Sequence, residues 1–186
     1  MLEAPRRRTL NHHRTVTYES FERDDGLFDI EGTVYDTKGY LYSDRERGEL
    51  KPGEALHDIR ARLTIDESYV VVDFSTEMAA APFGYCQSAV DPKQLVGSCI
   101  TAGWRKSVDR AFGPYRGCTH LRDIVLGMGT IAFQTLSANS DEKMLAAGLS
   151  DRDATERPRY LGGCHSWALS GPVVETFFPQ FHKPKD

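Results

Sequence analysis

The stretch LHDIRARLTI at residues 56–65 alternates strictly between apolar and polar side chains, and it is the clearest structural signal in the chain. Successive side chains of a β-strand point to opposite faces of the sheet. One face of this predicted strand therefore carries His57, Ile59, Ala61, Leu63 and Ile65, and the other carries Asp58, Arg60, Arg62 and Thr64. The pattern is typical of a strand with one buried face and one polar face.

Three further stretches predict strands, at residues 14–20 (RTVTYES), 27–36 and 69–78. Asp24-Asp25-Gly26 is a turn signal, so the first two strands should form a hairpin. Alternation places Asp29 and Glu31 on one face of the second strand and Phe28 and Ile30 on the other. Residues 37–53 read as a charged loop. Four sequential antiparallel strands are the simplest arrangement.

The second half of the chain predicts helices. They should cover Pro92–Cys99 with Asp91 as N-cap, Trp104–Phe112, and a longer segment from Cys118 or Thr119 to about Leu136. A short helix is expected at 142–147, and 173–178 should add a strand or an extended cover. We therefore expect an α+β fold, with about four antiparallel strands packed against the helices of the C-terminal half. The domain should span 14–186, after a flexible basic arm at 1–13.

Composition and charge exclude several classes of protein. The 186 residues are 40% hydrophobic and 27% charged, as in an ordinary globular domain. A net charge of −4 argues against a general nucleic-acid binder, whose affinity comes from lysine and arginine. No apolar run is long enough to span a bilayer, and the first twenty residues lack a signal peptide. The expected location is the cytoplasm, with no membrane partner, and the sequence leaves open whether the chain forms a homodimer.

Four cysteines, Cys86, Cys99, Cys118 and Cys164, include no Cys-x-x-Cys pair. The cytosol keeps thiols reduced, so each is a buried thiol, a nucleophile or a metal ligand. Zinc and iron both accept thiolates and imidazoles. Cys86, Cys118 and His120 are the candidate ligands, although no spacing matches a structural zinc signature. The cofactor therefore stays open between none, zinc and iron.

The sharpest motif is Gly117-Cys118-Thr119-His120, which follows a Gly-Pro turn and opens the longest predicted helix. The positive end of a helix dipole, with Arg116 nearby, favours a thiolate and suits a nucleophile or a metal ligand. Alternatively, Thr119 caps the helix, Cys118 packs as a small hydrophobe and His120 bonds to a backbone carbonyl.

Two other histidines belong to motifs of the same kind. His165 follows Cys164 in a Gly-flanked turn, which can equally be a loop that needs its glycines for backbone reasons. His57 falls on the apolar face of its strand, so its protonation should depend on burial, although a lone core histidine is more often simply hydrogen-bonded. Asp58 points the other way if the strand is regular.

The chain resembles the bacterial domain-of-unknown-function family 2889. The matching stretches run in order along most of the chain: DDGLFDIEG (24–32), DTK (36–38), GEALHDIRARLTID (53–66), GYC (84–86), LVGSCITAGW (95–104), RGCTHLRDI (116–124), AFQT (132–135) and CHSWALSGPVV (164–174) before FPQF. The resemblance implies an association with bacterial catabolism of aromatic compounds. It assigns no reaction. The chain is also faintly similar to iron–sulfur scaffold proteins in the order of its motifs, which are Gly53…His57-Asp58, then Cys86, then Cys118…His120.

Three hypotheses for function follow. The first is a small carbon–carbon lyase that releases formaldehyde or carbon dioxide from a phenolic compound by general acid–base chemistry. His57 or His120 would be the base, with Cys118 and Asp58 in the same candidate set. The substrate would be held by a larger group: Arg116, Trp104, Tyr85, Tyr35 and His165. The second is a metal-binding or carrier protein, and the third is a module that binds an aromatic ligand without turnover.

Overall fold

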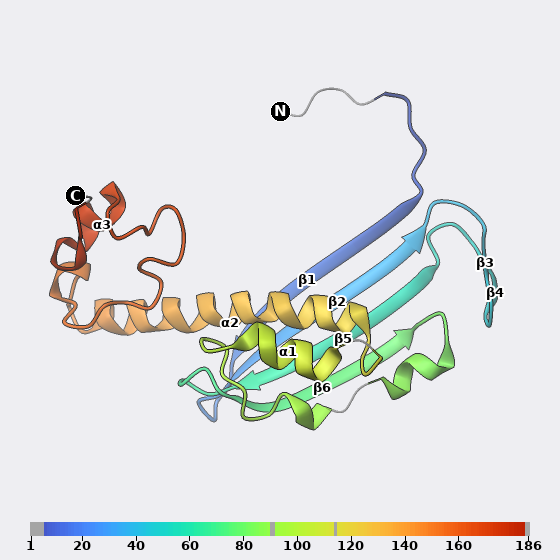
Figure 1. The fold of residues 1–186 in the computed structure, drawn as a ribbon, viewed down its shortest axis with the longest axis horizontal. Helices are drawn as coiled ribbons and strands as arrows, with labels where there is room; N and C mark the ends of the chain where they lie inside the picture. Colours follow the sequence, from blue (N-terminus) through green and yellow to red (C-terminus); the bar gives the residue numbers. More distant parts are fainter. Residues whose placement is uncertain (1–5, 90–91, 114, 185–186) are drawn as a thin grey trace. The chain divides into compact units, whose positions relative to one another are not determined.

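The computed structural model describes residues 6–89, 92–113 and 115–184. It contains an antiparallel sheet of four strands in the order β1-β2-β5-β6, followed along the chain by helices, as Figure 1 shows. This arrangement confirms the α+β class. The principal elements are β1 (His12–Glu22), β2 (Phe28–Lys38), β5 (Ala55–Ile65), β6 (Val71–Ala80), α1 (Trp104–Phe112) and α2 (Thr119–Ala146).

The two faces of the sheet differ as the alternation predicts. On β5, the residues of the predicted apolar face are all buried, whereas Arg60 and Arg62 on the other face are exposed. On β2, Phe28 and Ile30 are buried and Asp29 and Glu31 are only partly covered. Burial of each large aliphatic or aromatic side chain contributes about 1.5–3 kcal/mol, so the apolar face fixes which side of the sheet the helices cover.

Helix α2 packs on the apolar face through a stripe at helical spacing. Five of its side chains are at most 1% exposed: Leu121, Ile124, Val125, Met128 and Ala132. Two glycines allow a close approach. A Cβ on Gly32 of β2 would lie 3.0 Å from Sδ of Met128, and a Cβ on Gly129 would overlap the indole ring of Trp104. The helices therefore press directly on the sheet and on each other.

Several predicted boundaries are wrong. Strand β1 begins at His12, inside the predicted arm. The predicted loop at 37–53 contains a hairpin of β3 (Tyr42–Asp44) and β4 (Gly48–Leu50). Its turn is closed by Oδ1 of Asp44, which accepts two backbone hydrogen bonds, from Glu46 and Arg47. A side chain that caps its own turn leaves no alternation for a sequence pattern to detect.

The helix predicted at Pro92–Cys99 is also wrong. Only a single 3-10 turn forms there, at Pro92–Gln94, and the predicted N-cap Asp91 lies outside the described residues. Gly97 has a φ of 82°, a left-handed conformation that ends any helix, and Cys99 then pairs with Val70 in a β-bridge. Tertiary pairing with the sheet therefore overrides the local helical signal.

Toward the C-terminus, the long helix continues beyond the predicted end at Leu136 and reaches Ala146, so the separate helix predicted at 142–147 is its last turn. The segment predicted as a strand at 173–178 is instead a short helix, α3 (Pro172–Phe177). Proline at its first position has the right φ for a helix start and lacks only an N–H that would have no partner there.

The chain forms two compact units, residues 1–133 and 134–186. The first holds the sheet, α1 and the beginning of α2. The second has a small core of its own, in which Leu161, Val174 and Phe178 are buried beside Tyr160 and Trp167. Burial and the nearby carboxylate of Asp141 raise the pKa of Tyr160. Each unit is described by itself below.

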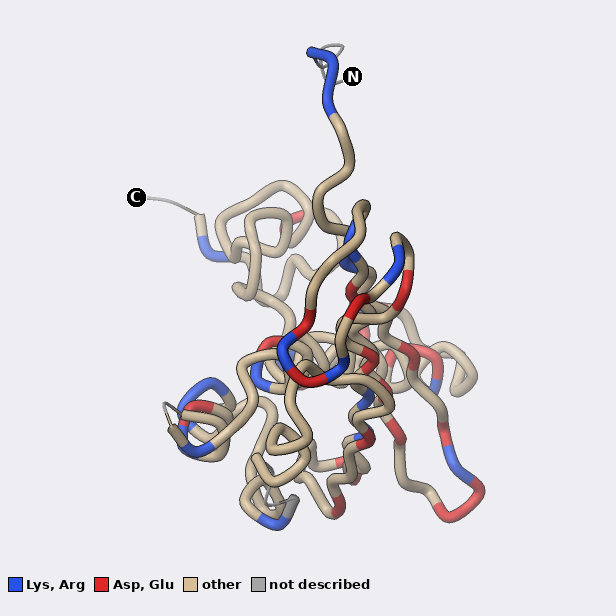
Figure 2. The backbone as a smooth tube through the Cα atoms, turned by 90° about the vertical axis from the view of Figure 1, so that its right-hand side faces the viewer, with Lys and Arg blue, Asp and Glu red and all other residues tan. Residues whose placement is uncertain are grey.

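Charged residues are distributed over the whole described chain. Figure 2 shows acidic and basic positions interspersed along the backbone, with a basic segment beside the N-terminus. Within the described residues, no helix combines the length and the apolar character that crossing a membrane requires.

Candidate active site

The site begins with a row of three charged or ionisable side chains that crosses β1, β2 and β5 near one end of these strands. Strand pairing sets Arg14 of β1 opposite Asp36 of β2, and Asp36 opposite His57 of β5. Residues directly opposite in an antiparallel pair project from the same face, so the three side chains meet. The β2–β5 register shifts immediately after Asp36, which makes this row the last regular one in that pair.

Asp36 lies between the other two residues of the row and is fully buried. Arg14 donates two hydrogen bonds of 2.7 Å, from Nε to Oδ1 and from Nη2 to Oδ2. His57 Nδ1 lies 2.9 Å from Oδ2 and His12 Nε2 lies 3.3 Å from Oδ1. A carboxylate has about four lone-pair sites, so these contacts account for all of them.

The electrostatics of the row keep Asp36 ionised. Burial opposes its ionisation, but the hydrogen bonds and charge of Arg14, with help from His57 and His12, outweigh burial and lower the pKa of Asp36 to about 2. In return, the hydrogen bond to Asp36 raises the pKa of Arg14. Because a carboxylate can only accept, His57 Nδ1 carries the hydrogen and Nε2 is left with a free lone pair.

A second histidine from the first turn of α2 completes the cluster. The ring centroids of His57 and His120 are 3.9 Å apart, with 38° between the ring planes. His120 Nε2 lies 4.0 Å from Asp36 Oδ2, and His120 Nδ1 lies 3.7 Å from Cys118 Sγ. Cys118, His120 and Asp36 thus follow one another in the order of a thiol, a base and a carboxylate.

Both imidazoles are neutral near pH 7. Burial, followed by repulsion from the positive charge that His120 gains on protonation, lowers the pKa of His57 from 6.5 to about 4, although Asp36 opposes that shift. Burial and the charge of Arg14 also lower the pKa of His120. A neutral imidazole whose other nitrogen is held by a carboxylate is the form that can accept a proton.

A cavity of about 570 Å³ opens onto these groups. Its volume is in the range of small-molecule sites. The ionisable and nucleophilic side chains in its lining include His57, Cys118 and His120, and most of the remaining wall is apolar or aromatic. Other described lining residues include Ile59, Pro82, Phe83, Tyr85, Cys86, Tyr115 and Arg116.

The structure brings many of the residues predicted from sequence to this cavity. His57, Cys86, Cys118 and His120 all line it, together with Tyr85 and Arg116 as predicted contacts of a substrate. Cys86 is not part of the group of ligand atoms found within 4.8 Å of one another among the described residues, which is Asp36, His57 and His120.

Other predicted residues lie elsewhere. Tyr35 pairs with Asp58 on the opposite face of the sheet, where Asp58 Oδ1 is 3.5 Å from Arg60 Nε without hydrogen-bond geometry. Trp104 packs against Gly129 of α2, and its buried Nε1 has no hydrogen-bond partner in the described chain. His165 belongs to the second unit, where it is exposed.

Sequence reasoning missed Asp36 and Arg14. A signal was present, because Asp36 occupies a position of the face that carries Phe28, Ile30 and Val34. A carboxylate at an apolar position must be paired or neutralised. The hairpin predicted between the first two strands offered Arg14 as its partner, but only the register places the two side chains opposite each other.

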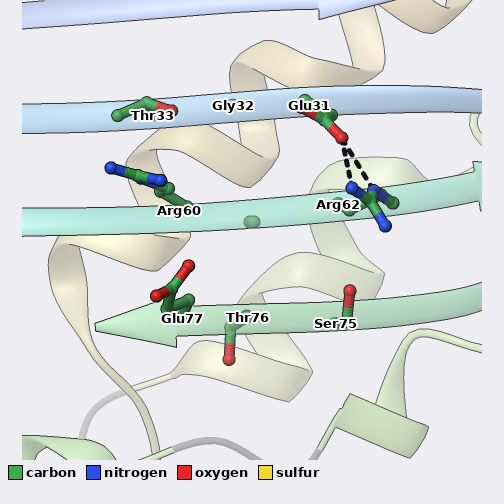
Figure 3. A pocket seen from close by; sticks show the side chains of 9 residues that line it. Glu31, Gly32, Thr33, Arg60, Arg62, Ser75, Thr76 and Glu77 are labelled. Carbon is green, nitrogen blue, oxygen red and sulfur yellow. Dashed lines mark hydrogen bonds and ion pairs between the residues drawn. The ribbon is translucent and has the colours of Figure 1, made fainter. Parts of the chain in front are cut away.

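A second hollow, of about 290 Å³, lies on the other face of the sheet. Figure 3 shows Arg62 of β5 reaching Glu31 of β2, with Arg60 and Glu77 nearby. The Arg62 Nε–Glu31 Oε1 distance is 2.8 Å and the Nη2–Oε1 distance is 2.6 Å. Charges that pair across neighbouring strands in this way stabilise a solvent-facing sheet surface.

The chain belongs to the family described as Protein of unknown function (DUF2889), whose model matches residues 12–134. The match contains every strand of the four-stranded sheet and all the residues that line the cavity. It therefore confirms the family that the sequence motifs resemble. No curated protein and no solved structure is detectably similar to the chain.

The buried imidazole predicts a specific dependence of stability on pH. The unfolded chain protonates His57 near pH 6.5, whereas the folded chain does so only near pH 4. Between these values the unfolded state binds more protons. The free energy of unfolding therefore shows no loss from His57 above pH 6.5, and it falls as the pH drops toward 4. The loss attributable to His57 is on the order of 3 kcal/mol. Urea unfolding at half-unit pH steps measures it.

The matched control for this experiment is His57→Gln. The variant should lose much of the decline between pH 6.5 and 4 while keeping the later loss from Asp36, whose pKa of about 2 lies below its ordinary 3.8. An identical decline in both proteins would show that His57 is not the buried neutral group.

Proposed function

We propose that the protein is a small cytoplasmic enzyme of bacterial aromatic catabolism that breaks a carbon–carbon bond in a phenolic substrate by general acid–base chemistry. The observation that supports this most is the neutral His57, held by ionised Asp36 at the wall of an aromatic-lined cavity. Such a pair can act as a general base, because the free Nε2 is unprotonated at neutral pH and the carboxylate offsets part of the cost of forming the imidazolium.

The parts have distinct roles in this proposal. His57 Nε2 takes the proton of the reacting group, and Asp36 holds the ring in the tautomer that makes this possible. His120, stacked on His57, is the second acid–base group, and Cys118 is within reach of its Nδ1. Arg14 keeps Asp36 charged and takes no part in proton transfer.

Two outcomes fit this machinery. In decarboxylation, the base takes the phenolic proton and passes it to the ring carbon that bears the carboxylate, and the pair of the breaking carbon–carbon bond returns to the ring as carbon dioxide leaves. In deformylation, the base removes the proton of a hydroxymethyl group, whose O–H pair becomes the second C–O bond of formaldehyde. For this step, the ring carbon that bears the group first takes up a proton to give the dienone form of the phenol. The pair of the breaking carbon–carbon bond then restores the aromatic ring, and the carbonyl pair ends on the phenolic oxygen. Neither reaction needs a cofactor to accept electrons.

The test is turnover by the purified protein. A panel of para-hydroxylated aromatic compounds carrying carboxylate or hydroxymethyl groups is incubated with it, and formaldehyde, carbon dioxide and the shortened phenol are measured. Turnover by the wild type and its loss in His57→Gln are expected. Tight binding without any conversion would contradict the proposal and favour an aromatic-ligand-binding module.

The metal-binding alternative has one observation in its favour. Asp36, His57 and His120 offer a carboxylate and two imidazoles whose ligand atoms lie within 4.8 Å of one another. A metal ion would have to displace Arg14, His12 or His57 from Asp36, since the carboxylate already has four contacts. Elemental analysis of protein purified without chelator separates the two hypotheses, and about one equivalent of zinc or iron that disappears in Asp36→Asn would favour the metal.

A further inference from the structure

The charges around the cavity are unbalanced. Among its described lining residues there is no aspartate and no glutamate, and Arg116 carries the one formal positive charge. The charge of the buried Asp36 behind the wall is balanced by Arg14, with which it is paired. His57 and His120 add no charge at neutral pH. The lining is therefore apolar with a net positive charge.

Arg116 has no carboxylate partner within the described residues. Its side chain is exposed and makes no ion pair or hydrogen bond within the described residues, unlike Arg14, Arg23, Arg60, Arg62 and Arg122, which all face carboxylates. An arginine without a carboxylate partner beside an apolar cavity offers its planar donors to an anionic ligand, which it can bind through two parallel hydrogen bonds.

The backbone around Arg116 is held in an unusual conformation. The preceding residue, Tyr115, has a φ of 69°, in the left-handed region that a side chain other than glycine rarely adopts. The turn is closed by the Arg116 N–H, which donates to the Gly113 carbonyl at 3.0 Å. Strained positions of this kind gather at ligand sites, and here both Tyr115 and Arg116 line the cavity.

We infer that the cavity selects aromatic compounds that carry a carboxylate, with Arg116 binding the carboxylate and the aromatic walls holding the ring. This inference rests on the proposed function, because it names the substrate class of the same site. It also makes Arg116 a specificity residue with no part in proton transfer. Substrates whose acidic group is replaced by a neutral isostere should enter the cavity but bind weakly.

Binding measured without turnover tests this separately from the proposed reaction. Isothermal titration calorimetry at pH 7.5 compares 4-hydroxybenzoate with 4-hydroxybenzamide, which has the same shape but no charge. The wild type should bind the benzoate about tenfold more tightly, as one charge-assisted pair allows. Arg116→Gln should bind both compounds equally, near the affinity of the wild type for the amide.

The matched control is Arg105→Gln, which removes an exposed arginine of α1 that does not line the cavity among the described residues. It should keep the full preference for the anion. Equal binding of both compounds by the wild type, a preserved preference in Arg116→Gln, or no binding of either compound would each overturn the inference. A preference for the anion in a protein that converts nothing would uphold it and leave only the lyase reaction refuted.

Discussion

Replacing Arg14 with methionine should lower the free energy of unfolding by about 3 kcal/mol, because the buried Asp36 carboxylate then loses its strongest partner. Asp36 is fully buried, whereas the Arg14 side chain is 37% exposed. Water can therefore enter partly when the guanidinium is removed, which places the expected loss toward the low end of the range for buried ion pairs. Chemical denaturation followed by circular dichroism measures the change.

A double-mutant cycle tests whether that loss of stability comes from the unpaired charge of Asp36. Arg14→Met combined with Asp36→Asn removes both charges, so it should be more stable than Arg14→Met alone. Arg23→Met provides the surface control, since Arg23 pairs with the exposed Asp25 and its removal should change stability little. If Arg14→Met unfolds no more easily than Arg23→Met, then Asp36 does not depend on its guanidinium partner.

The largest effect on activity is expected from His57→Gln, which should reduce kcat about 10²- to 10⁴-fold for any substrate that the wild type converts. Glutamine can still donate a hydrogen bond to Asp36, so the fold and the cavity should persist while the basic nitrogen is lost. Steady-state kinetics on the substrate found in the turnover screen provide the measurement, and KM should change far less than kcat.

Two comparisons make this prediction specific to His57. His13→Gln alters a histidine whose neighbours on β1, His12 and Arg14, face the cluster while it points away, so kcat should not change. The wild-type acid limb of kcat/KM should fall near pH 4 and not near the ordinary 6.5, because protonation of His57 removes the base. An acid limb centred at 6.5, or full activity in His57→Gln, would assign the base to another group.

Much of the fold can be predicted from local patterns. Alternation over 56–65 identifies β5 and assigns its faces correctly, since each side chain of a strand is oriented by its own backbone. The stripe from Leu121 to Ala132 likewise identifies α2, although not its end. The predictions that are wrong, at 37–53, 92–99 and 173–178, concern short elements whose conformation depends on a turn cap, a β-bridge or a proline more than on periodicity.

The candidate site was only half predictable for the same reason. Its histidines and Cys118 stand in short motifs that a sequence displays openly. Their organising residue, Asp36, lies in a strand with no motif character beyond the DTK stretch, 22 residues from Arg14 and 21 from His57. Conversely, Trp104 and Tyr35 have suitable chemistry, but helix packing and strand alternation direct them away from the cavity.

The sequence by itself determined the strand faces, the long helix and the residue types available for chemistry, because these follow from spacing along one segment. Only the tertiary structure decided that Arg14, Asp36 and His57 form one row and that α2 sets His120 on top of it. That outcome depends on the register of three strands and on a helix packed against them. Burial within this arrangement is also what makes the two imidazoles neutral, a property that none of their neighbours in the sequence could confer.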